Sequence, residues 1–181
     1  MESKNCKLTE LNLRYNKLTE IGAKDLSEAL KSEHCKLMKF HIKSIKIADQ
    51  GAKYLKEALK SEQCKLEKLS ISHNNISKKA AKYHSEALKS KNCKITELNI
   101  SDNILNNKAS KYFSEALKNA NCKLCTLYIS SNIIEDEGAK YIQEALYREN
   151  SKLTKLTIGF NKLSEDYEKK LRVDYPNIIP F

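Results

Sequence analysis

The chain has 181 residues, of which 40% are hydrophobic and 31% are charged, and its formal net charge is +10. This length fits one domain with a substantial core, and no stretch approaches the roughly 18 consecutive apolar residues of a membrane span. Nearly all of the positive charge is lysine, which lacks the planar fork that grips phosphate or guanine, so it favours weak attraction to acidic partners over specific nucleic-acid readout.

A 29-residue interval runs along the chain, and cysteine marks it. Five of the six cysteines follow this interval and Ser151 takes the sixth place, so turns start near residues 6, 35, 64, 93, 122 and 151. We interpret these cysteines as reduced thiols at a repeated structural position rather than as a disulfide framework. Cys122 and Cys125 form a lone CxxC pair without a second pair or suitable histidines, so we expect no metal.

Each turn begins with a predicted strand and loop. In the first turn Leu11 and Leu13 alternate with polar neighbours, as in a half-buried strand, and Asn16 follows. The second turn has Ile45 in place of this asparagine. The later turns repeat the pattern with Leu66, Leu69, Ile71, Asn74; Ile95, Leu98, Ile100, Asn103; Leu124, Leu127, Ile129, Asn132; and Leu153, Leu156, Ile158, Asn161.

The second half of each turn is a predicted helix. Ala52, Leu55 and Leu59 fall on one stripe of such a helix, at i, i+3 and i+7. His84 takes the place of the core leucine in the third helix, so we expect a satisfied or half-buried imidazole. Because asparagine tolerates the left-handed conformation of a helix C-cap, the asparagines near the expected helix ends are predicted C-caps: Asn5, Asn92, Asn121 and Asn150.

Neither half of a turn can bury its apolar face alone, so the turns must stack. Parallel strands stack about 4.8 Å apart and helices need about 8–10 Å, which bends the stack with strands on the concave face and helices on the convex face. Residues from about 164 to 181 are polar, contain both prolines, and are predicted to cap the C-terminal end. Leu8, Leu11 and Leu13 would leave the first edge open, where we expect self-association or docking on another chain or on a preceding domain.

This pattern resembles the leucine-rich repeat, over nearly the whole chain. The run Gly51-Ala52-x-x-Leu55-x-x-Ala58-Leu59 and its counterparts look like the ribonuclease-inhibitor-like subfamily, which includes the repeat regions of NOD-like receptors and the GTPase-activating protein for Ran. The resemblance implies an α/β solenoid of six 29-residue repeats in a single domain, residues 1–181. It also implies that the asparagines form a buried ladder that satisfies loop backbone groups.

The sequence holds no phosphate loop, HExxH, GxSxG or dinucleotide fingerprint, so we expect no enzyme, no cofactor and no small-molecule substrate. The favoured function is a cytoplasmic protein–protein interaction module: an adaptor, an inhibitor or a host-targeting effector. The lysine-, isoleucine- and asparagine-rich composition resembles proteins of AT-rich genomes, including intracellular bacteria, so the location could lie inside a host cell. The alternatives are electrostatic binding to nucleic acid or an anionic membrane surface, and regulation of a GTPase.

Positions that differ between turns are free to carry specificity, and they fall on the predicted concave face. The first three turns are basic there, the fourth is acidic, and the last two add aromatic residues. Aromatic and basic groups on a rigid sheet are plausible anchors for a protein with an acidic surface. The predicted partner-binding residues are Arg14, Tyr15, Lys39, His41, Lys43, Lys68, His73, Tyr128 and Phe160.

Overall fold

A computed structural model describes residues 1–16, 19–43, 48–148 and 151–178, so Ile45 lies outside the described residues. Within these ranges short strands alternate with helices, beginning with β1 (Glu10–Asn12) and α1 (Glu20–Leu30). The following pairs are β2 (Lys39–His41) and α2 (Ala48–Leu59), β3 (Lys68–Ser70) and α3 (Lys78–Leu88), β4 (Glu97–Asn99) and α4 (Asn107–Leu117), β5 (Thr126–Tyr128) and α5 (Asp136–Leu146), and β6 (Lys155–Thr157) and α6 (Glu165–Asp174).

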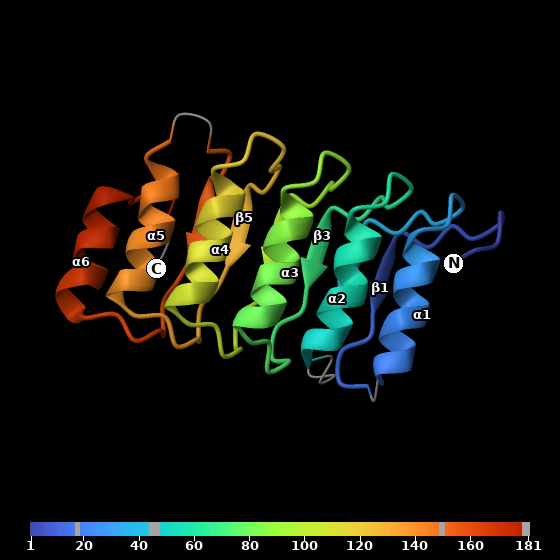
Figure 1. Cartoon of the computed structure of the whole chain (residues 1–181), viewed down its shortest axis with the longest axis horizontal. Coiled ribbons are helices and arrows are strands. Elements are labelled where there is room, and N and C mark those ends of the chain that lie inside the picture. Colours follow the sequence, from blue (N-terminus) through green and yellow to red (C-terminus); the bar gives the residue numbers. More distant parts are fainter. Residues whose placement is uncertain (17–18, 44–47, 149–150, 179–181) are drawn as a thin grey trace.

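The strands form one parallel sheet in the order β1-β2-β3-β4-β5-β6, and the helices line up beside one another in front of it (Figure 1). The register places every residue opposite the residue 29 positions later, so that Leu11, Phe40 and Leu69 are neighbours. The core lies between the two layers, where the strand leucines and isoleucines meet the helix alanines and leucines. The predicted α/β solenoid with a parallel sheet is therefore confirmed.

The column of cysteines lies in this core. Cys35, Cys64, Cys93 and Cys122 are free and buried, whereas Cys6 in the first turn is only half-buried. Burial raises the pKa of the Cys93 thiol to about 11 and raises the pKa of Cys64 and Cys122 as well, because a thiolate would be poorly solvated there. These thiols pack as small apolar groups and are poor nucleophiles.

The predicted asparagine C-caps are wrong. The helices α1, α3, α4 and α5 are followed by residues with right-handed backbone, and Asn5, Asn92 and Asn121 are not left-handed, while Asn150 lies outside the described residues. Instead, the Nδ2 atoms of Asn92 and Asn121 donate to the carbonyls of Lys60 and Lys89, at 3.0 and 3.1 Å. These two asparagines therefore connect their helix-to-strand turns to the turns before them.

The asparagine ladder joins neighbouring turns at the opposite edge of the stack, in the loops that lead from strand to helix. The Oδ1 atom of Asn103 accepts from the backbone N–H groups of Asn74 and Ile76, both at 2.9 Å, while its Nδ2 donates to the carbonyls of Ile71, Ile100 and Ser101. Asn74, Asn103 and Asn132 are buried, but Asn161 is half-buried and Asn16 is exposed at the first turn. The ladder that the family resemblance implies is therefore buried in the interior turns alone.

His84 does not have the satisfied environment expected of it. Its side chain is only 1% exposed, and neither ring nitrogen has a hydrogen-bond partner among the described residues. The other turns have apolar residues at the equivalent positions: Leu26, Leu55, Phe113, Ile142 and Leu171. Burial lowers the pKa of His84 to about 4, because an imidazolium would lose its solvation there.

The two ends of the stack differ. Beyond α6 the chain returns to the sheet, where the carbonyl of Ile178 accepts a hydrogen bond from the backbone N–H of Leu156 at 2.7 Å. At the other end Leu8 is 40% exposed, although its counterparts in later turns are buried. The outer edge of β6 is thus covered by the chain itself, and the outer edge of β1 remains accessible.

We expect Asn103→Ala to lower the free energy of unfolding by about 3 kcal/mol, because it leaves buried backbone donors and carbonyls unsatisfied. Asn16→Ala is the matched control, since Asn16 is exposed and, among the described residues, donates only to the carbonyls of Leu13 and Arg14; we expect it to cost less than about 1 kcal/mol. Urea denaturation of both variants measures the difference. Equal effects would contradict the account of the ladder.

We expect His84→Leu to stabilise the protein and to reduce its loss of stability in acid. The pKa of His84 is about 4 in the folded chain and about 6.5 when unfolded, so protons bind preferentially to the unfolded state as the pH falls from about 6.5 to about 4. At about pH 4, His84 therefore lowers the free energy of unfolding by up to about 3 kcal/mol. Denaturant melts of both proteins at pH 7.5, 6, 5 and 4 measure this; parallel pH profiles would contradict it.

Candidate partner-binding surface

The outward side chains of the strands form rows across the concave face, because the sheet pairs residues 29 positions apart. Within a row, successive strands bring side chains about 4.8 Å apart. The first row consists of Glu10, Lys39, Lys68, Glu97, Thr126 and Lys155. The second row consists of Asn12, His41, Ser70, Asn99, Tyr128 and Thr157.

The first row contains ion pairs that change the expected charge pattern. Lys39 Nζ lies 3.4 Å from Glu10 Oε2, and Lys68 Nζ donates to Glu97 Oε2 at 2.7 Å. This hydrogen bond and the negative charge of Glu97 raise the pKa of Lys68. Lysine and glutamate therefore partly neutralise each other across this row, an interaction between turns that the predicted charge pattern did not include.

A second set of contacts joins the first two turns. The Nη2 atom of Arg14 lies 3.3 Å from His41 Nδ1, and His41 Nε2 lies 3.5 Å from Glu10 Oε1. Glu10 thus faces both Lys39 and His41. Among the described residues the Arg14 guanidinium has no other hydrogen-bond partner, and one imidazole nitrogen can take only one of its five N–H groups.

These residues surround a small hollow of about 200 Å³ in the middle of the concave face, here named the concave hollow. Ser70 is only 6% exposed, yet its Oγ atom has no hydrogen-bond partner among the described residues. Four of the predicted partner-binding residues line this hollow together. The lining consists of Arg14, His41, Lys68, Leu69, Ser70, Glu97, Asn99 and Tyr128.

Two cation–π pairs lie at the concave hollow and beside it. The ammonium group of Lys155 lies 5.5 Å from the centre of the Tyr128 ring, and that of Lys43 lies 5.9 Å from the centre of the Tyr15 ring. Such cation–π contacts hold long side chains in defined positions. Lys43 and Tyr15, both predicted to bind a partner, therefore form a separate pair at the first turns rather than part of the hollow.

The remaining predicted residues lie where the loop leaves each strand. Tyr15, His73 and Phe160 all have left-handed backbone, with φ of 60°, 57° and 57°, and Asp102 and Ser131 share this conformation at the same place in their turns. Phe160 is 89% exposed, and it lines a hollow of about 680 Å³ at the C-terminal end of the sheet. An exposed phenylalanine in this conformation is an unfavourable choice for stability.

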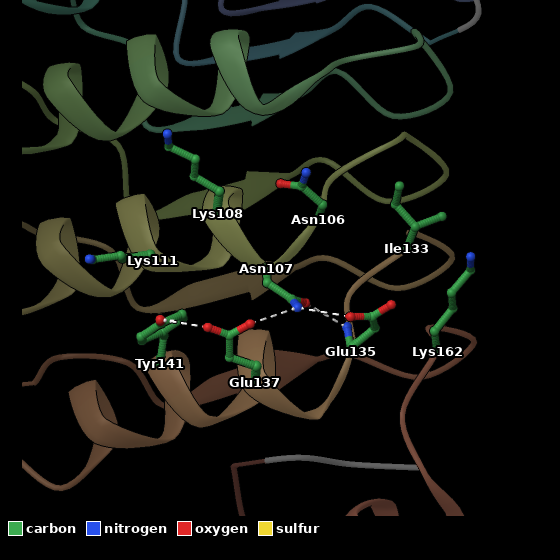
Figure 2. Close-up of a pocket in the computed structure, with 9 residues that line it drawn as sticks. All are labelled: Asn106, Asn107, Lys108, Lys111, Ile133, Glu135, Glu137, Tyr141 and Lys162. Carbon is green, nitrogen blue, oxygen red and sulfur yellow. Dashed lines mark hydrogen bonds between the residues drawn. The ribbon is translucent and has the colours of Figure 1, made fainter.

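Sequence reasoning missed a further hollow of about 540 Å³ between the N-terminal ends of α4 and α5, here named the edge hollow (Figure 2). Its centre is Asn107, whose Nδ2 donates to Glu135 Oε2 and Glu137 Oε2 at 3.0 and 3.2 Å. Its Oδ1 accepts from the backbone N–H of Glu135 at 2.8 Å, and the Tyr141 hydroxyl donates to Glu137 Oε1. Asp49 and Asp136 occupy the equivalent positions of two other turns, and each accepts hydrogen bonds from the following turn, at Ser77 and Ser164. A polar residue repeated at this position is therefore a signal that could have marked the contact in the sequence.

The comparisons with known proteins agree with this architecture. The sequence profile of the family described as Leucine Rich repeat matches residues 4–27, 62–83, 91–108 and 120–142. The chain is a leucine-rich-repeat protein. The matches fall in four of the turns and say nothing of the subfamily, so the ribonuclease-inhibitor-like assignment stays a prediction.

Solved structures share the fold of this leucine-rich-repeat chain at low sequence identity. Actin-binding site 2 of leiomodin-1 superposes with a TM-score of 0.58 and 19% identity, covering 70% of this chain and 77% of that one. An internalin from Listeria monocytogenes superposes with a TM-score of 0.52 and 18% identity over 96% of this chain, which spans 48% of the internalin. No curated protein matches the sequence significantly.

Two further features bear on ligands of this leucine-rich-repeat protein. Within the described residues, no three histidine, cysteine, aspartate or glutamate side chains gather as a metal site would require. None of the described helices is long and apolar enough to cross a membrane.

We expect Gly138→Ala to destabilise the protein by about 1–3 kcal/mol through overpacking. A Cβ atom at Gly138 would lie 2.7 Å from Asn107 Oδ1 and 2.9 Å from Asn107 Cα, so the contact between α4 and α5 would have to open. Gly159→Ala is the matched control, because a Cβ atom there meets nothing within 4 Å. Thermal melts of both variants measure the difference; a Gly138→Ala protein as stable as the parent would show that the contact adapts freely.

Proposed function

We propose that this leucine-rich-repeat protein is a non-enzymatic protein-binding module, and that its concave hollow takes an acidic side chain of the partner. The observation that carries the proposal is the convergence of Arg14, Lys68 and the unpartnered hydroxyl of Ser70 on one hollow. An incoming carboxylate would receive hydrogen bonds from the guanidinium and from the hydroxyl. Charge-assisted hydrogen bonds of this kind are stronger than neutral ones.

The size of the concave hollow supports a protein ligand. Its volume of about 200 Å³ is below the range of about 300–1,000 Å³ that is typical of small-molecule sites, so it suits one side chain of a larger partner. Tyr128 on its wall and the exposed Tyr15 and Phe160 farther away are the kind of aromatic residues that are enriched at binding hot spots. The partner would therefore contact the sheet widely and place one acidic side chain at its centre.

The kind of partner and the cellular role of this chain are further parts of the proposal. Leiomodin-1 site 2 is described as actin-binding, which supports the use of this fold for binding a protein and does not transfer actin to this chain. We favour a cytoplasmic adaptor, inhibitor or host-targeting effector over a GTPase regulator, because the described residues offer no convergent catalytic set. Docking through the open edge of β1 is a second proposal, which the 40% exposure of Leu8 supports.

A random peptide library displayed on phage, selected against the purified protein, tests the proposal. We expect the selected peptides to be rich in aspartate and glutamate, and Arg14→Ala to weaken their binding about tenfold or more by calorimetry. Lys68→Ala should weaken binding further, because it releases Glu97 to repel the peptide. Glu97→Gln should instead strengthen binding, since it removes a carboxylate that competes for Lys68.

Lys140→Ala is the control for these variants. Lys140 is exposed on α5, away from the sheet, so its loss removes one positive charge without touching the concave hollow. Selected peptides without acidic residues, or an affinity that follows net charge alone in all four variants, would refute the proposal.

A further inference from the structure

The positive charge of the protein is concentrated on one of its two long edges. The turns that lead from each helix to the next strand lie together at the upper edge of the stack in Figure 1, and the loops from strand to helix lie at the lower edge. Four of the upper turns, here named the lysine rim, cover residues 31–37, 60–66, 89–95 and 118–124. They contain nine lysines and two glutamates, a formal charge of +7 out of +10 for the chain.

The opposite edge has no such excess. Four described loops of the same length, residues 73–79, 102–108, 131–137 and 160–166, contain four lysines and six acidic residues, a formal charge of −2. The general surplus of lysine in this protein therefore does not explain the lysine rim, since the surplus is absent from an equivalent set of loops.

The lysines of the rim are accessible and largely without ion pairs. Six of them are exposed and the other three are half-buried. Within the described residues, the only carboxylates within 4 Å of a rim lysine are Glu28, 2.6 Å from Lys31, and Glu144, 3.3 Å from Lys118. Lys94 and Lys123 reach back to loop carbonyls at 3.5 and 3.3 Å, which is a structural role for two of the nine.

The shape of the lysine rim favours a flat partner. The stack curves because neighbouring helices need more space than neighbouring strands. This curvature lies in a plane perpendicular to the strands. The turns at one edge therefore all end at about the same level along the strand direction. The in-register hydrogen bonds of Asn92 and Asn121 to the preceding turns hold this alignment. A planar anionic surface can contact all four turns at once. A straight nucleic-acid duplex cannot, because the charges of the four turns lie on an arc.

The residue types of the lysine rim also favour a lipid surface over nucleic acid. Its four turns contain no arginine, phenylalanine, tyrosine or tryptophan, the residues that grip phosphate and bases in nucleic-acid sites. Lysine is a hydrated point charge, which suits the diffuse potential of an anionic lipid surface. We propose that the lysine rim is a docking surface for anionic lipid headgroups, which sets the protein edge-on against a membrane and leaves the concave face open to the side.

Binding to vesicles tests this proposal. We expect the protein to bind vesicles of phosphatidylcholine with 30% phosphatidylserine at 50 mM salt, to ignore vesicles of phosphatidylcholine alone, and to dissociate at 300 mM salt as the charges are screened. Each lysine near such a surface contributes roughly a fivefold gain in affinity, so the triple variant Lys36→Glu, Lys65→Glu, Lys91→Glu should bind about 100-fold more weakly or worse.

The matched control is the triple variant Lys78→Glu, Lys79→Glu, Lys140→Glu, whose exposed lysines lie on helices outside the lysine rim and which has the same net charge. We expect it to bind vesicles within about threefold of the parent, and circular dichroism should show both variants folded. Equal losses in the two variants, or no binding to the anionic vesicles, would overturn the proposal. A 20-base-pair DNA duplex that binds more tightly than the vesicles, through the same three lysines, would overturn it in favour of nucleic acid.

Discussion

Every turn of this solenoid depends on its neighbour to complete its hydrogen bonds and its core. The side-chain amide of Asn103 shows this constraint at one residue, since it accepts from the backbone of the turn before and also donates to a carbonyl there. On the other edge, Asn92 and Asn121 play a comparable part. These contacts keep all strands in one register, and the register in turn decides which side chains meet on the concave face.

The periodic part of this structure could be predicted from the sequence because burial and spacing repeat together. The alternation of Leu11 and Leu13 with polar residues predicts which face of the strand is buried, and the same pattern recurs every 29 residues. The prediction failed where a residue type has two physical uses. Asparagine can adopt a left-handed cap or can bridge two turns, and only the position of the neighbouring carbonyl shows that Asn92 bridges.

The ion pairs of the concave face were also missed, although the sequence contains a signal for them. Lys68 and Glu97 are 29 residues apart, which makes them neighbours in any in-register parallel sheet of this repeat. Reading charges across the turns instead of along each turn would have found this pair. The edge hollow was missed in the same way, because Asn107 occupies the position that Asp49 and Asp136 hold in their turns, and these residues also accept hydrogen bonds from the next turn.

The unequal charge of the two edges makes this protein an electric dipole whose axis runs along its strands. A body of this kind experiences a torque as well as an attraction when it comes within about 10 Å of a negatively charged surface, and the torque turns its positive end forward. The strands then stand upright on that surface. Orientation is in this way built into the distribution of lysines, before any individual contact has formed.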